Sequence, residues 1–286
     1  MAALLAAMSA VAFGVGDFLG GLSARRMAAV AATLVAQATG LVLVLVLAPL
    51  VGGSATTTDL AWGAAGGVAG ATALMLFYWA LGAGQMSVVA PVSAVMSAVV
   101  PMVFGLVDGE RPGPVALVGA LVALPAIVLI SREPGDPRGD DETDRPPHPA
   151  APTRVLLASV AAGVGFGAFF VCISRSGSGS GLWPLAASRL VAVPIVAVVV
   201  LAARAWHPSG DGTRPALAAG VFDVSANAIF LEASRHGLLT LVGVIGAMYP
   251  ASTVVLARVV LKERLAAHQL LGLGLAAVSL VAVSAG

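Results

Sequence analysis

Four polar side chains stand inside apolar stretches of this sequence, where a charge is costly. Asp17 occurs in the glycine-rich run AVAFGVGDFLGG, Arg189 occurs in LAASRLVAVPIV, and Asp223 and Asn227 lie four positions apart in another apolar segment. At the centre of a membrane helix one charge costs about 2.5–3.5 kcal/mol, so such residues pair with one another or face a water-filled cavity. A carboxylate in such a place can bind a cationic group or exchange a proton.

Asp17 has two interpretations. At helical spacing it shares a face with aromatic and small residues: Phe13, Gly14, Gly20 and Gly21. Small residues let helices approach closely, so this face should pack inward and aim Asp17 at a cavity as a cation or proton site. In the alternative, Asp17 lies near the membrane interface and pairs with Arg25 or Arg26.

The other three residues also leave alternatives open. Asp223 and Asn227 lie one helical turn apart on one face, where they bind a ligand or make an interhelical hydrogen bond. Arg189 can complement Asp17 or Asp223, hold an anionic group, or extend to the near interface.

Four further residues are candidates for a cavity wall. Gln37 lies inside an apolar segment, and Tyr249 precedes Pro250, a residue that permits a helix to bend. Tyr78 and Trp79 come at the end of a segment, where aromatic residues line a cavity or belong to the belt at the membrane surface.

The elements that must position these residues are membrane helices. The chain has 286 residues, of which 59% are hydrophobic and 10% charged, whereas soluble domains are about 45–50% apolar and about 25% charged. A spanning helix needs about 20 mostly apolar residues, and ten windows qualify: 2–22, 28–51, 60–81, 86–107, 114–131, 155–174, 182–203, 215–234, 238–261 and 266–285. The sequence therefore predicts an all-α polytopic membrane protein with ten transmembrane helices.

A repeat divides the chain into two halves. An offset of 153 residues places Glu110 and Arg111 on Glu263 and Arg264, and it also places Gly67 on Gly220. We predict a first five-helix repeat at 1–131, a solvated linker rich in proline and charge at 132–153, and a second repeat at 154–286. Because five spans is an odd number, the second repeat enters the membrane from the opposite side, which predicts two inverted repeats.

Two segments resemble the paired repeats of a known family. SAVVPMVFGLVDGERPGPVALVGALV and YPASTVVLARVVLKERLAAHQLLGLGL look like the two EamA repeats of the drug/metabolite transporter (DMT) superfamily. In one respect the halves differ, because Ser97 stands where the second half has Pro250, and Pro101 comes four residues later. Any helix kink would then lie at different depths in the two halves.

The resemblance implies a function. The family moves small solutes, often outward, so we expect a secondary-active exporter of a small organic metabolite or drug. Transport would proceed by alternating access around a central cavity, with protons as a candidate coupling ion. The alternative from a different class is a membrane sensor or assembly subunit that transports nothing.

Other function classes find little support in the sequence. The four histidines lie in different joints without metal-ligand spacing, and no nucleophile motif occurs, so we expect no enzyme, no metal site and no cofactor. A net charge of +1 does not favour nucleic acid as a partner. The expected partners are a small organic solute and the lipid bilayer of a prokaryotic plasma membrane. Glu110 and Glu263 come at span ends beside arginines, where we expect a structural role.

The distribution of basic residues predicts an orientation. Joints after odd-numbered spans hold Arg25, Arg26, Arg132, Arg138, Arg145, Arg154, Arg204, Arg214, Lys262 and Arg264, whereas joints after even-numbered spans hold Arg111, Arg175 and Arg235. Because basic residues concentrate in cytoplasmic loops, the odd joints are predicted to be cytoplasmic and both termini to lie outside.

Overall fold

The protein is a bundle of long helices. The structure, a computed structural model, describes residues 1–83, 86–132, 153–207, 209–262 and 265–285, and none of these residues lies in a β-strand. The helices are α1 (Ala2–Ala24), α2 (Ala29–Val51), α3 (Thr57–Ala83), α4 (Met86–Val107), α5 (Pro114–Ser131), α6 (Thr153–Ser174), α7 (Trp183–Ala202), α8 (Gly210–His236), α9 (Leu239–Gly246), α10 (Pro250–Val260) and α11 (Ala267–Ala285), with a short 3₁₀ turn η1 (Ser178–Ser180) before α7.

Within the residues that the structure describes, ten spans are long and apolar enough to cross a membrane, as predicted, and the ninth consists of α9 and α10 together. The chain is therefore an integral, multi-pass membrane protein of the predicted fold class. One boundary differs clearly, because α8 begins at Gly210 and not at the predicted residue 215. The hydroxyl of Ser209 accepts a hydrogen bond from the Gly212 amide at 3.1 Å, and such a cap stabilises a polar first turn.

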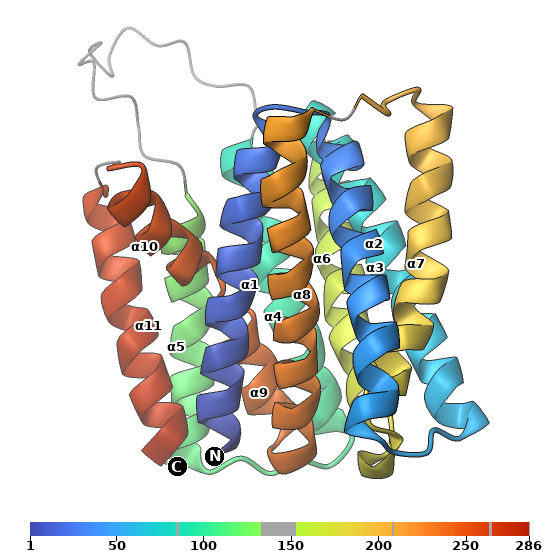
Figure 1. The fold of residues 1–286 in the computed structure, drawn as a ribbon. Coiled ribbons are helices and arrows are strands. Elements are labelled where there is room, and N and C mark those ends of the chain that lie inside the picture. Colours follow the sequence, from blue (N-terminus) through green and yellow to red (C-terminus); the bar gives the residue numbers. More distant parts are fainter. Residues whose placement is uncertain (84–85, 133–152, 208, 263–264, 286) are drawn as a thin grey trace, which may run out of the picture.

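The predicted linker at 132–153 falls almost wholly outside the described residues. Only its two ends, Arg132 and Thr153, are among the residues that the structure describes. The described helices α5 and α6 end and begin beside it. Figure 1 shows both termini at one end of the bundle and these two helix ends at the other. The proposed domain boundaries remain a prediction.

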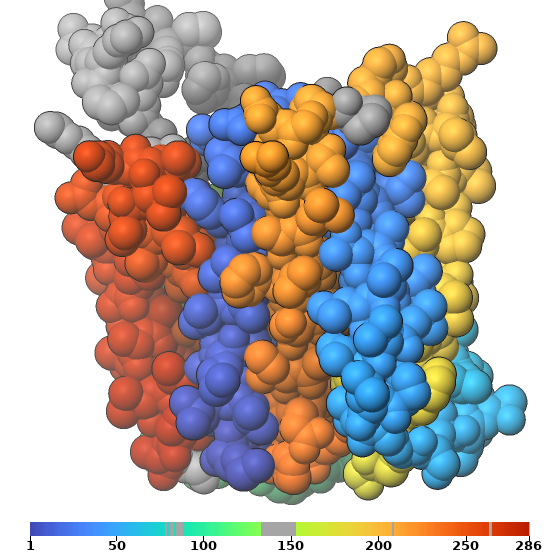
Figure 2. All heavy atoms as spheres, viewed as in Figure 1, coloured from blue at the N-terminus to red at the C-terminus, as the bar shows by residue number. Residues whose placement is uncertain are grey.

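The helices pack in pairs that correspond under the offset between the halves. Helix α1 of the first half packs along α8 of the second half. In the same way α6, the counterpart of α1 in the second half, packs along α3 of the first half. Similarly, α2 packs on α8 as α7 packs on α3, and the last helices of the halves, α5 and α11, pack on each other at one side of the bundle (Figure 1). The front face in Figure 2 is covered by α1 and α8 side by side, with α2 next to α8.

Two equivalent glycines allow close helix approaches. A Cβ atom at Gly67 of α3 would lie 2.3 Å from the carbonyl oxygen of Ser188 in α7. A Cβ atom at Gly220 of α8 would lie 2.3 Å from the carbonyl oxygen of Ala36 in α2. In lipid, helix association relies on such close backbone contact, so the same residue does the same work in each half.

The fourth helices of the two halves differ. In the first half α4 runs unbroken through Pro91 and Pro101. In the second half the corresponding span stops at Gly246 and resumes at Pro250, as α9 and α10. The sequence predicted kinks at different depths in the two halves. The structure shows a larger difference, because the described span of the second half is broken and that of the first half is not. Breaks of this kind near the middle of a membrane line binding sites in transporters.

Candidate functional site

A polar network joins three helices in the bundle interior. The Arg189 guanidinium of α7, only 5% exposed, donates one hydrogen bond to the Gln37 side-chain oxygen of α2 and another to the Asp223 carboxylate of α8. The Asn227 amide group donates to the Asp223 backbone carbonyl at 2.7 Å and lies 3.4 Å from its carboxylate. Of the roles left open for Arg189, the structure shows pairing with Asp223.

This network depends on the close approach of α2 to α8. A Cβ atom at Gly40 of α2 would lie 3.5 Å from the Val224 Cβ and 3.7 Å from the Arg189 Nε. These are ordinary contact distances, so the backbone of α2 at Gly40 lies directly against the arginine and α8. In the described part of the chain, no three His, Cys, Asp or Glu side chains come together in a way that suits a metal ion.

Asp17 lies on the inner face of α1. Exposed residues of this helix, such as Leu4, Met8 and Val11, form the opposite, lipid-facing stripe. The Asp17 side chain is nevertheless exposed, and a Cβ atom at Gly20 or Gly21 would meet nothing within 4 Å. An inner-face residue can be exposed only where the interior is open, so Asp17 borders a space inside the bundle.

Asp17 has no counter-ion. Within the residues that the structure describes, its carboxylate forms neither a hydrogen bond nor an ion pair, and the alternative pairing with Arg25 or Arg26 is not formed. The charged group that acts on it is the carboxylate of Asp223, which repels it. Tyr249 also lies within electrostatic range of Asp17. These contacts bring Asp17 together with the network as one site.

The α9–α10 break is fixed against α1 beneath Asp17. Ser252 and Thr253 of α10 donate hydrogen bonds to the carbonyl oxygens of Ala10 and Gly14, at 3.0 Å and 3.2 Å. A Cβ atom at Gly14 would lie 2.6 Å from the Tyr249 carbonyl oxygen, so only glycine permits this approach. The break is thereby placed beside the site.

Aromatic rings form a cluster beside the break, and the sequence did not single this cluster out. The Phe13 ring lies 6.3 Å from that of Tyr249 and 5.8 Å from that of Phe170 in α6. Phe170 in turn contacts Phe169 and Phe230. Phe170 in the second half corresponds to Asp17 in the first half under the offset of 153 residues. The sequence signal for this cluster was the match of phenylalanines between the two halves. Phenylalanine is also an ordinary lipid-facing residue, so that match alone did not indicate a site.

Of the remaining aromatic candidates, Trp79 is not brought to this site. Trp79 is 49% exposed and shares the outer face of α3 with Val68, which is the membrane-belt position. The Tyr78 side chain lies outside the described part of the structure. Trp62, Trp183 and Trp206 likewise lie near the ends of helices or just beyond them, as expected of interface anchors.

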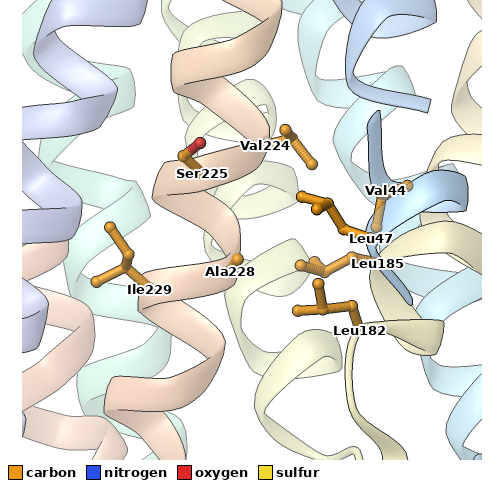
Figure 3. A pocket seen from close by; sticks show the side chains of 8 residues that line it. All are labelled: Val44, Leu47, Leu182, Leu185, Val224, Ser225, Ala228 and Ile229. Atoms are coloured by element: carbon orange, nitrogen blue, oxygen red, sulfur yellow. The ribbon is translucent and has the colours of Figure 1, made fainter. Parts of the chain in front are cut away.

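An apolar pocket lies one turn from the polar network. It opens between α2, α7 and α8, has a volume of about 200 Å³, and is lined by the eight residues labelled in Figure 3. Leu185 and Val224 of this wall are the neighbours of Arg189 and Asp223 along their helices. The only polar side chain in the wall, that of Ser225, donates to the Val221 carbonyl at 2.7 Å, so the pocket presents hydrocarbon.

Glu110 has the structural role expected of it. Its carboxylate accepts hydrogen bonds from the Leu239 and Thr240 amides, both at 2.7 Å, and from the Thr240 hydroxyl at 2.6 Å. A residue of the first half therefore caps the N-terminus of α9 in the second half. The equivalent Glu263 falls outside the described residues. Glu232 pairs locally with Arg235 and His236.

Comparison with known proteins identifies the class of protein. The model of the EamA-like transporter family matches residues 153–285. No curated protein matches the chain. One solved structure, described simply as the crystal structure of a protein, is 17% identical, with a TM-score of 0.74 over 99% of this chain and 96% of that one. That likeness shows the fold.

The family match agrees with the resemblance seen in the sequence. The match covers residues 153–285, the second half of the chain, and supports its assignment to the EamA-like transporter family. The matched family is one of transporters, and the ten candidate spans among the described residues are consistent with its fold.

Proposed function

We propose that the protein is a secondary-active transporter that exports a small organic metabolite or drug, with protons as the coupling ion. The observation that carries this proposal is the Asp17 carboxylate, which is exposed and has no counter-ion among the residues that the structure describes. A structural carboxylate in a membrane interior is expected to be paired. One that is held unpaired beside an open space is suited to exchange a proton or a cationic group.

The two ends of the bundle differ around Asp17, as alternating access requires. On the side of the termini, the inner-face residues Ala6, Ala10 and Gly14 of α1 are buried. On the other side, Gly20 and Gly21 adjoin empty space. This asymmetry supports a state in which the site is open at the end that carries Arg25 and Arg26, and closed at the end of the termini.

Polar contacts between the two halves hold the closed end together. Asp108 forms an ion pair with Arg175 at 2.8 Å, Glu110 caps α9, and the Asp59 carboxylate accepts a hydrogen bond from the Gly177 amide at 2.7 Å. Opening the site toward this end would require these contacts to break. These three contacts are local, so a rocking motion of two inverted repeats could break them and is a reasonable mechanism.

The proposed direction follows from the distribution of basic residues. The open end carries Arg25, Arg26 and Arg214, and cytoplasmic loops of membrane proteins are enriched in arginine. The open end would then face the cytoplasm of a prokaryotic cell and load substrate there. Uptake of a proton by Asp17 from the outer side, followed by its release inside, would drive export.

The test compares the small molecules released by a transporter-poor host that expresses the wild-type chain, Asp17→Asn or Asp211→Asn at matched membrane levels. Asp211 is an exposed carboxylate at the start of α8, so its variant controls for loss of a negative charge. We expect a compound to be exported by the wild type and by Asp211→Asn only. Equal export by Asp17→Asn would assign Asp17 a structural role, and no release under any gradient would favour a sensor or assembly subunit.

A further inference from the structure

The charges left free at the site restrict the chemistry of the substrate. Arg189 uses its two terminal nitrogens on Gln37 and Asp223, so its positive charge is compensated inside the bundle. Among the described residues of the site, the Asp17 carboxylate is then the charged group that has no partner. A substrate carboxylate or phosphate would find no free cation there, whereas a substrate cation would find a free anion.

The walls around Asp17 add a second indication. Phe13 lies one helical turn from Asp17 on the same inner face, and its ring contacts those of Tyr249 and Phe170. Phe170 stands at the position of the second half that corresponds to Asp17 in the first half, and its buried ring packs against that of Phe13. The π-face of an aromatic ring attracts a cation, and the ring also packs against an apolar body.

A buried acceptor at the site lacks a donor. The side-chain oxygen of Asn227 is buried and has no hydrogen-bond partner, although the amide nitrogen of the same side chain binds Asp223. Buried polar atoms are nearly always paired in a completed structure. The N–H group of a ligand, or a water molecule that accompanies it, would satisfy this oxygen.

We infer that the transported solute is an organic monocation, namely a protonated amine with an aromatic or alkyl body. Its ammonium group binds the Asp17 carboxylate, and its apolar body rests on Phe13, Phe170 and Tyr249. This assignment deepens the proposed function and rests on it for transport, but not for binding. It also excludes a zwitterion as the preferred substrate, because Arg189, the arginine that the described part of the structure places at the site, is already paired.

The test uses four probes that share a benzene ring and differ in charge. Phenethylamine is the cation, phenylethanol the neutral analogue, phenylalanine the zwitterion and 3-phenylpropanoate the anion. Binding to the purified full chain in lipid nanodiscs is measured by equilibrium dialysis with radiolabelled probe. We expect phenethylamine to bind at least about 10-fold more tightly than the other three. Tighter binding of the zwitterion or of the anion would overturn the inference.

Variants then test the assigned residues. Asp17→Asn should lose the preference for the amine, while Asp211→Asn keeps it. Phe170→Leu keeps the apolar wall but removes the ring, and should weaken amine binding about 2- to 30-fold without affecting phenylethanol as much. Circular dichroism and size-exclusion chromatography establish that each variant is folded. Unchanged amine preference in folded Asp17→Asn would contradict the assignment.

The binding experiment tests the substrate class and the transport experiment tests the proposed function, and each hypothesis can fail without the other. If the amine binds through Asp17 but is not moved in vesicles under a proton gradient, the substrate class stands and the proposed transport does not. If the export comparison identifies an anionic or zwitterionic compound, the proposed function stands and the organic-cation assignment is wrong.

Discussion

Arg189 and Asp223 form an ion pair in the interior of a helix bundle that is otherwise largely apolar. Their helices, α7 and α8, make little other contact, because α2 lies between them (Figure 1). The pair reaches around α2 and also includes Gln37, so three helices from both halves are linked by one guanidinium. The consequence is a neutral anchor beside Asp17, whose carboxylate has no partner in the described part of the chain.

Removing one member of this pair should destabilise the protein. Arg189→Leu leaves Asp223 without its cation in the interior, so we expect a loss of about 3 kcal/mol in the free energy of unfolding. The double variant Arg189→Leu with Asp223→Leu should recover part of that loss, since no unpaired charge is left. Unfolding in mixed detergent micelles measures both. A double variant less stable than Arg189→Leu would contradict this interpretation.

Replacing Glu110 should weaken the closed end without affecting the binding site. Glu110→Ala removes the acceptor for the Leu239 and Thr240 amides, and loss of a helix cap costs about 1 kcal/mol. Glu110→Gln keeps one acceptor oxygen and should lose less. Thermal unfolding ranks the three proteins, and probe binding should remain unchanged. A large loss of binding in Glu110→Gln would instead place Glu110 in the transport path.

The two equivalent glycines should tolerate alanine equally badly. In Gly67→Ala and in Gly220→Ala the new methyl group meets a backbone carbonyl at 2.3 Å, so the helices must separate, at a cost of about 1–3 kcal/mol. Gly21→Ala is the matched control, since a Cβ atom there meets nothing within 4 Å. Thermal unfolding of the three variants should show two large decreases and one near zero.

Thiol labelling should reveal which end of the bundle is open. In a Cys172→Ala background, Gly20→Cys should react with a membrane-impermeant maleimide applied from the end that carries Arg25 and Arg26. Ala10→Cys, buried on the same inner face, should stay unlabelled from either side in the absence of substrate. Inside-out and right-side-out vesicles distinguish the two ends. Labelling of Gly20→Cys from the end of the termini would reverse the proposed orientation.

The spans could be predicted, and Asp17 could be singled out as a candidate, because the bilayer makes simple demands. A helix that crosses it must be about 20 residues long and mostly apolar, so ten windows were visible in the sequence and confirmed by the structure. A carboxylate inside such a window is costly, which is why Asp17 and Asp223 could be picked out by residue type alone. The repeat was visible because charged matches, such as Glu110 with Glu263, are rare in this composition.

The partners of these residues could not be predicted in the same way. Arg189 had two carboxylates within its possible reach, and the choice of Asp223 depends on how closely α2 and α8 cross at Gly40 and Gly220. Phe170 was one of nine phenylalanines until packing brought it to Phe13. The α9–α10 break depends on its contacts with α1, since Pro91 and Pro101 leave α4 unbroken.

The sequence by itself therefore determined which segments enter the membrane and which few charges must be accommodated there, because hydrophobic transfer is a local property of each segment. Only the tertiary structure decided that Arg189 neutralises Asp223 and that Asp17 has no partner within the described residues. That outcome depends on distances between helices far apart in the chain, and those distances are set by side-chain packing at their crossings.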